Sequence, residues 1–187
     1  PSMAQNRTAA KRLRASCEPL IAQLARPCAS PPALACVSQA AIAERIFAGA
    51  HSIPSTADLQ LANHLADAAG AAIRALFRGQ WVEERKDDRS YVTEADRAAE
   101  AAMRAILEAE RPDDGIVGEE YGAIREGAAR QWVLDPIDGT TSFIAGRAIF
   151  GTLIALVQDG WPVLGVIDQP IQKERWAGRV GAPTTFN

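Results

Sequence analysis

Residues 150–170, FGTLIALVQDGWPVLGVIDQP, decide the fold class of this chain. Two apolar runs flank the dipeptide Asp159-Gly160, which is typical of the tight turn in a β-hairpin. The pattern therefore predicts two antiparallel strands. The segment that follows, KERWAGRVG at 173–181, predicts a third strand and makes this part of the chain a meander.

Two segments upstream of the meander have the three-and-four spacing of apolar residues that indicates amphipathic helices. The first, residues 55–79, opens on Ser55 with an aspartate three residues later, which is a capping-box pattern. The second, within residues 91–112, has Thr93 as its N-cap and Pro112 as its stop. Both segments are predicted to be helical.

Short strands are predicted around the second helix, because apolar residues there come in brief runs that end at turn-forming residues. Since the helices precede the meander and do not alternate with its strands, the sequence predicts an α+β fold. We expect two N-terminal helices packed on a largely antiparallel sheet. The short strands are expected at residues 81–85, 115–120 and 131–135.

Residues 1–50 differ in composition from the rest of the chain. They hold six Lys and Arg against two Glu, and all three cysteines. Transit peptides are similarly rich in Arg and poor in acids, but a poorly ordered extension or a helix-forming appendage has the same composition. We therefore assign residues 1–50 to an N-terminal extension of uncertain order and residues 51–187 to the folded unit.

Composition excludes several classes of function. A formal net charge of −3 lacks the basic excess that a nucleic-acid binder needs. No apolar run reaches the roughly 18 residues that cross a bilayer. Three cysteines without a C-x-x-C pair fit neither a disulfide framework nor a zinc site. We expect a cytoplasmic protein that binds neither nucleic acid nor membrane.

Acidic residues follow two of the predicted strands. Asp135 and Asp138 lie in WVLDPIDGTTSF at 132–143, and Glu119 and Glu120 follow a buried strand. Carboxylates gathered this closely raise one another's pKa unless a cation lies between them. Carboxylate and carbonyl oxygens without His or Cys favour Mg²⁺ or Mn²⁺ over zinc. We therefore expect a magnesium site, with Mn²⁺ as the other candidate ion.

The residues around the two aspartates suit a metal and phosphate site. Pro136 fixes one backbone torsion between them, and Gly139 permits a tight turn. The run 140–142 can start a helical turn whose N–H groups bind phosphate. A plain surface turn is the alternative explanation, because Asp-Pro and Asp-Gly are common in turns. The D-x-D-G-T phosphatase signature and the calcium loop both fail on spacing.

Three segments resemble the inositol monophosphatase family of magnesium-dependent, lithium-sensitive phosphatases. They are KDDRSYVTEADRAAE at 86–100, IVGEEYG at 116–122 and WVLDPIDGTTSF, in the family's order and spacing. The resemblance runs from about residue 56 to 187. Within the family, SFIAGRAIFGTLIAL and ERWAGRVGAPTTFN look most like the histidinol-phosphatase branch, whereas inositol-type members usually have Asn where Ser142 stands.

The resemblance implies a hydrolase in which metal-activated water attacks a phosphate monoester. Glu119, Asp135, Asp138 and the carbonyl of Ile137 would hold the metals. Glu119 and Thr140 would be the catalytic pair that positions the attacking water. The implied substrate-binding residues are Glu119, Ile137, Asp138, Gly139 and Thr140.

Three further residues surround this set. The resemblance implies that Asp96 holds an outer metal through water, but Asp96 also lies three residues after Thr93 and could complete a capping box. Lys86 is a weaker candidate for the same periphery. Glu120 is expected to be a solvated neighbour of the site.

The resemblance also implies the fold and the substrates. The helices and sheet would be the first layer pair of an αβαβα sandwich. Family members continue into a W-D-x-x-A-G motif for the second metal, so we expect a truncated chain that binds metal weakly and turns over poorly. Histidinol phosphate, from histidine biosynthesis, is the first expected substrate and inositol monophosphate the second. The alternatives are a non-catalytic fragment that binds metal or self-associates, including as a homodimer, and a module that binds a phosphorylated metabolite.

Overall fold

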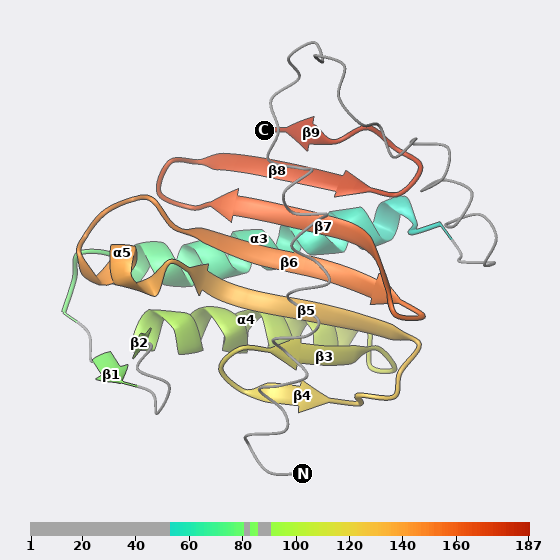
Figure 1. Ribbon diagram of the computed structural model, residues 1–187, viewed down its shortest axis with the longest axis horizontal. Coiled ribbons are helices and arrows are strands. Elements are labelled where there is room, and N and C mark those ends of the chain that lie inside the picture. The colour runs from blue at the N-terminus through green and yellow to red at the C-terminus, as the bar shows by residue number, and fades with distance from the viewer. Residues whose placement is uncertain (1–52, 81–82, 86–90) are drawn as a thin grey trace, which may run out of the picture.

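The computed structural model describes residues 53–80, 83–85 and 91–187 (Figure 1). A seven-stranded sheet forms one layer. Helices α3 (Thr56–Leu76) and α4 (Glu94–Glu110) lie across one face of this sheet. The predicted extension at residues 1–50 lies outside the described residues. In the part that is described, no helix is both long enough and apolar enough to span a bilayer.

Both long helices begin at the predicted N-caps. The Ser55 side chain accepts from the backbone N–H of Asp58, whose carboxylate accepts from the backbone N–H of Ser55. Thr93 and Asp96 form the same reciprocal pair at the start of α4. Each capping box satisfies N–H groups that a helix start otherwise leaves without acceptors. The capping pattern in the sequence is therefore confirmed.

The sheet is antiparallel except for one parallel pair of strands. That pair is β3 (Gly115–Gly118) and β5 (Arg130–Asp138), and the remaining five neighbouring pairs are antiparallel. The predicted hairpin is confirmed, since Asp159 and Gly160 have the positive φ values of 49° and 82° that a tight β-hairpin turn requires. In sheet order the strands are β4 (Gly122–Ile124), β3 (Gly115–Gly118), β5 (Arg130–Asp138), β6 (Gly151–Gln158), β7 (Trp161–Gln169), β8 (Glu174–Arg179) and β9 (Thr185–Phe186).

The sequence reasoning missed three of the shortest elements. They are β2 (Tyr91–Thr93), β4 and β9, each of two or three residues. Strand β2 pairs with β1 (Glu83–Arg85) in a separate small sheet. Runs this short show no measurable periodicity, so only their pairing partners define them.

The main core lies between the sheet and the two helices. In β5 and β6, alternate residues belong to this core, as the period of two in a strand predicts. The indole of Trp132 is the largest side chain that is completely buried there. The fully buried core also contains Leu65 and Ile73 of α3, Met103 and Leu107 of α4, and Ile116, Leu156 and Leu164 of the strands.

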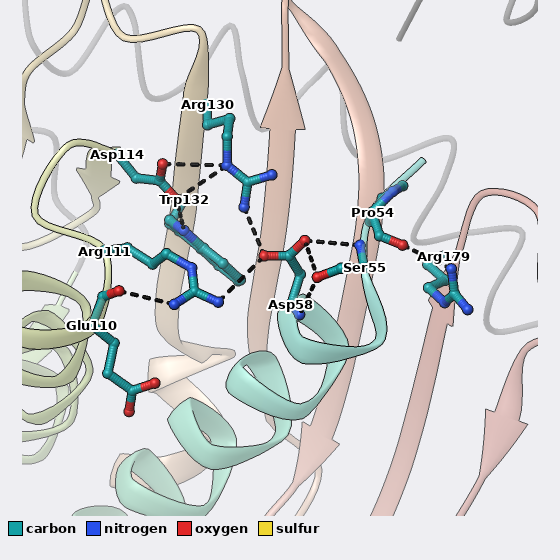
Figure 2. A network of polar contacts seen from close by, with 9 residues as sticks. All are labelled: Pro54, Ser55, Asp58, Glu110, Arg111, Asp114, Arg130, Trp132 and Arg179. Atoms are coloured by element: carbon teal, nitrogen blue, oxygen red, sulfur yellow. Dashed lines mark hydrogen bonds and ion pairs between the residues drawn. The ribbon is translucent and has the colours of Figure 1, made fainter. Parts of the chain in front are cut away.

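A polar network ties the start of α3 to the sheet (Figure 2). The Asp58 carboxylate accepts from Arg130 of β5 at 2.7 Å and lies 3.6 Å from the guanidinium of Arg111. Arg130 also donates to Asp114 at 3.2 Å, and the Trp132 indole N–H donates to Asp114 at 2.9 Å. These contacts join α3, the end of α4 and the first residues of β5.

Replacing Asp58 by Asn is expected to lower the free energy of unfolding by about 2 kcal/mol at neutral pH, the usual scale for hydrogen bonds to a charged group. Burial opposes ionisation of Asp58, but hydrogen bonds from Ser55 and Arg130 outweigh it and lower the pKa of this carboxyl. Because the folded-state pKa is lower than the unfolded value of about 3.9, the stabilisation is present above pH 4. It is lost as the pH falls through the folded-state pKa.

Urea unfolding of both proteins between pH 7 and pH 3 measures this effect. The gap between wild type and Asp58→Asn should be largest at neutral pH and should narrow below about pH 4. Asp113→Asn is the matched control, because Asp113 is an exposed aspartate in the turn after α4. A gap that stays constant down to pH 3 would show that the Asp58 carboxylate is not the source of the stabilisation.

Candidate active site at the ends of β3 and β5

The parallel pairing of β3 and β5 brings Glu119 beside Asp135. Gly118 pairs with Leu134 in the sheet register, and the backbone N–H of Glu119 donates to the carbonyl of Leu134 at 3.2 Å. The residue that follows this pair is an acid in both segments, Glu119 after β3 and Asp135 in β5, and the two acids lie at the same end of the sheet. Asp135 is buried, with 7% of its surface exposed, whereas Glu119 is exposed.

A β-bulge separates Asp135 from Asp138. Asp135 pairs with Leu153 of β6, whereas Asp138 pairs with Gly151, so β5 uses one residue more than β6 over this stretch. In a regular strand, residues three apart face opposite sides of the sheet, and an extra residue changes that alternation. The buried hydroxyl of Thr152 donates to the Pro136 carbonyl at 2.8 Å and holds the bulge. Asp138 emerges exposed at the strand end.

The predicted turn at Gly139 is confirmed. Gly139 has φ 103° and ψ 38°, a left-handed conformation that favours glycine. A Cβ at this position would also lie 3.3 Å from the Cβ of Phe150. Gly139 is the N-cap of α5 (Thr140–Ile144), as the run of Thr and Ser predicts, and its carbonyl accepts from Ser142 N–H at 2.8 Å.

The short helix α5 is anchored by an aromatic cluster. Phe143 is completely buried, and its ring centroid lies 5.7 Å from Phe77 at the end of α3 and 5.4 Å from Phe150. Aromatic pairs at these separations stabilise beyond the area that they bury. The cluster therefore fixes the segment that follows Asp138 against the rest of the domain.

Thr140 and Asp96 meet next to the bulge. The hydroxyl of Thr140 lies 3.1 Å from the Ile137 carbonyl and 3.3 Å from Asp96 Oδ1, so either oxygen can accept its hydrogen. Asp96 Oδ2 takes the two capping bonds, from Thr93 N–H at 2.8 Å and Thr93 hydroxyl at 2.6 Å. The capping explanation of Asp96 is thus confirmed, and its other oxygen faces Thr140. Its role toward an outer metal stays a prediction.

Sequence reasoning missed Glu100, a fully buried carboxylate on α4. Its oxygens accept from the backbone N–H groups of Glu120 and Tyr121, in the loop after β3. The signal was present, since Glu100 lies on the apolar face of α4 between the buried Ala99 and Met103. An acid on such a face requires a specific partner. Predicted residue Lys86 lies outside the described residues.

Carboxylate and carbonyl oxygens are the ligands that a hard dication prefers. The strand register brings the backbone of Glu119, Asp135 and Asp138 to one end of the sheet. Within residues 53–80, 83–85 and 91–187, however, no three Asp, Glu, His or Cys side chains form a group that could hold a metal ion. The assignment of Glu119, Asp135, Asp138 and the Ile137 carbonyl as ligands stays a prediction. Their donor chemistry is that of magnesium sites, which need few protein carboxylates.

Comparison with known proteins identifies the family. Residues 56–187 match the model of the inositol monophosphatase family. The chain belongs to this family. One curated relative is the bifunctional phosphatase IMPL2, chloroplastic, of Arabidopsis thaliana, which is 54% identical to this chain over 127 residues. The matched residues are 67% of this chain and 37% of the relative. The histidinol-phosphatase of Mycobacterium tuberculosis is 43% identical over 64% of this chain and 46% of its own length.

Solved structures support the same family fold. An inositol monophosphatase from Zymomonas mobilis is 54% identical with a TM-score of 0.59, and the match covers 72% of this chain and 52% of that one. The predicted α+β class and the resemblance to the family are therefore confirmed. This inositol monophosphatase-family chain spans about half or less of the length of these proteins. The three are phosphatases by name, and the family is metal-dependent.

Proposed function

We propose that this chain carries the metal and phosphate site of a phosphoric monoester hydrolase. The observation that supports it most directly is the register of β3 and β5, which sets Glu119 beside Asp135 at one sheet edge. The bulge then presents Asp138 and the turn at Gly139 immediately after them. Two oxygen-rich segments, the loop after β3 and the end of β5 with its turn, thus lie side by side at one end of the sheet.

Each residue has a proposed part in hydrolysis. Glu119, Asp135, Asp138 and the Ile137 carbonyl would bind the metal, and Mg²⁺ is the proposed ion with Mn²⁺ as an alternative. Bound there, the ion would supply Lewis acidity that lowers the pKa of water and neutralises phosphoryl charge. Asp96 would act from the periphery through water, consistent with the capping bonds that already use one of its oxygens.

The remaining groups would handle water and phosphate. Glu119 and Thr140 would orient the water that attacks phosphorus. The hydroxyl of Thr140 can donate to the Ile137 carbonyl or to Asp96 Oδ1, and either bond would hold it for this task. The backbone N–H groups of Gly139 and Thr140 would bind the phosphoryl oxygens. The bond from phosphorus to the ester oxygen breaks as the bond to water forms, which yields an alcohol and inorganic phosphate. Fixed positioning and charge would supply most of the rate.

We propose histidinol phosphate as the first substrate and inositol monophosphate as the second. The similarity to the M. tuberculosis histidinol-phosphatase supports the first, and the similarity to the Z. mobilis inositol monophosphatase supports the second. Both esters present the same phosphate monoester to the same edge of the sheet. The alcohol part would distinguish them.

Release of inorganic phosphate from a panel of esters tests the proposal. The panel contains histidinol phosphate, inositol 1-phosphate and glycerol 2-phosphate, each with Mg²⁺, Mn²⁺, a chelator, or Mg²⁺ plus Li⁺. We expect release that requires the dication, is inhibited by Li⁺ and is fastest with histidinol phosphate. The M. tuberculosis relative serves as the positive control.

The same panel separates the alternatives. No release by this chain, when the positive control is active, would contradict the proposed activity. Calorimetric binding of an ester without release would then favour a module that binds a phosphorylated metabolite. Binding of Mg²⁺ alone, together with a solution mass above that of one chain, would favour a non-catalytic fragment that self-associates.

A further inference from the structure

Two residues of α4, Glu100 and Arg104, form hydrogen bonds with the loop after β3. Glu100 Oε2 accepts from the Glu120 N–H at 2.7 Å, and Glu100 Oε1 accepts from the Tyr121 N–H at 3.2 Å. The carboxylate therefore takes up two successive backbone donors directly after Glu119. A charged acceptor makes these bonds stronger than bonds between neutral groups.

Arg104, one helical turn later, completes the contact. Its Nε donates to Glu100 Oε1 at 2.8 Å, and this pair is almost wholly buried, with 14% of the Arg104 side chain and none of the Glu100 side chain exposed. Arg104 also donates to the Gly122 carbonyl, and its guanidinium lies 5.8 Å from the centroid of the Tyr121 ring. The charge of Glu100 is thus compensated without leaving the protein interior.

The backbone of β3 is shaped to admit this carboxylate. A Cβ on Gly118 would lie only 1.8 Å from Glu100 Oε1 and 2.3 Å from its Cδ. Glu100 thus occupies the space that a side chain at position 118 would fill. The carboxylate reaches the loop because residue 118 has no side chain.

We propose that Glu100 is a positioning residue for Glu119, and this role rests on the proposed function of the site. Glu119 is bonded on one side through its own N–H to the Leu134 carbonyl at 3.2 Å. On the other side, the next two N–H groups are bonded to Glu100. With the backbone fixed on both sides, the Glu119 carboxylate stays at the edge that it shares with Asp135.

The expected effect of such a positioning residue on metal affinity is large enough to measure. Groups that orient a metal ligand, without touching the metal, typically change metal affinity by about 10-fold to 100-fold when they are altered. Glu100→Gln keeps the shape of the side chain but leaves only one acceptor oxygen for the two loop N–H groups. We expect the loop to loosen and Glu119 to lose its fixed direction.

The test measures two quantities on the full chain with Mg²⁺ as the only ligand. Isothermal titration gives the affinity for Mg²⁺, and hydrogen exchange in the metal-free protein gives protection of the Glu120 and Tyr121 amides. Glu100→Gln should weaken Mg²⁺ binding about 10-fold and should speed exchange of these two amides. Leu107→Ala is the matched control, since Leu107 is a buried core residue of α4, two turns further on.

Leu107→Ala should lower stability but leave the Mg²⁺ affinity of the folded protein unchanged. Wild-type affinity and exchange in Glu100→Gln would overturn the proposal, and so would an equal loss of affinity in Leu107→Ala. If the wild type binds no Mg²⁺, the proposed function of the site fails. Amide exchange distinguishes that failure from a failure of the Glu100 contact, because it reports how Glu100 holds the loop whether or not metal binds.

Discussion

Replacement of Asp138 by Asn is expected to lower metal-dependent phosphate release by more than about 100-fold, because loss of a proposed direct metal ligand should exceed the effect of an outer group. The substitution keeps the size of the side chain and one oxygen, but it removes the negative charge that a hard dication requires. Asp138 is exposed at the end of β5, after the bulge, so the fold should survive. Phosphate release and Mg²⁺ affinity would both be measured, with circular dichroism as the check on folding.

Asp159→Asn provides the matched control for this variant. Asp159 is also exposed and follows directly on a strand of the same sheet, but it lies in the β6–β7 turn at the opposite end of β6 from Gly151. Its φ of 49° is a conformation that Asn adopts readily. Turnover and Mg²⁺ affinity should stay at wild-type levels in the control. Near-normal turnover in Asp138→Asn itself would remove Asp138 from the site.

Adding a single methyl group at Gly118 is expected to lower the free energy of unfolding by about 3 kcal/mol. In Gly118→Ala the new Cβ would lie 1.8 Å from Glu100 Oε1 and 2.8 Å from Arg104 Nη2. A Cβ does not approach non-bonded atoms this closely, so the buried ion pair has to separate or β3 has to move. Either response leaves a buried charge or a broken strand pairing, and urea unfolding would show the loss.

Gly127→Ala is the control for a glycine without such neighbours. A Cβ on Gly127 would have nothing within 4 Å, and its φ is not positive. The control should therefore be as stable as the wild type or slightly more stable, because alanine restricts the unfolded chain. Equal stability of the two alanine variants would show that Glu100 can leave its place at little cost. The positioning role proposed for Glu100 would then lose its structural basis.

Displacement of the Glu100 carboxylate in Gly118→Ala should also affect the proposed metal site. The same displacement that destabilises β3 frees the N–H groups of Glu120 and Tyr121 from their acceptor. Gly118→Ala should therefore resemble Glu100→Gln in Mg²⁺ affinity but exceed it in destabilisation. Both variants should bind Mg²⁺ with similar affinity, because both release the loop. Gly118→Ala should be the less stable of the two, because it displaces the Glu100 carboxylate further.

Much of the architecture could be predicted from short-range patterns. The caps at Ser55 and Thr93 and the turn at Asp159-Gly160 depend on residues at most three or four positions apart. The same holds for the left-handed turn at Gly139. Because the physics of each feature is local, the sequence contains all the information that it needs. The two- and three-residue strands lacked such a pattern, so their existence depended on a partner.

The candidate site depends instead on contacts between residues that are far apart in the sequence. The sequence by itself determined which oxygen-bearing residues were available, where the two long helices begin, and the family motifs that link Glu119, Asp135 and Asp138. Only the tertiary structure decided that β3 pairs with β5 in parallel, that a bulge turns Asp138 outward, and that Glu100 lies beneath the loop after β3. The reason is that strand register and buried contacts between α4 and a loop some 20 residues away are set by how the whole core packs, and no local spacing records them.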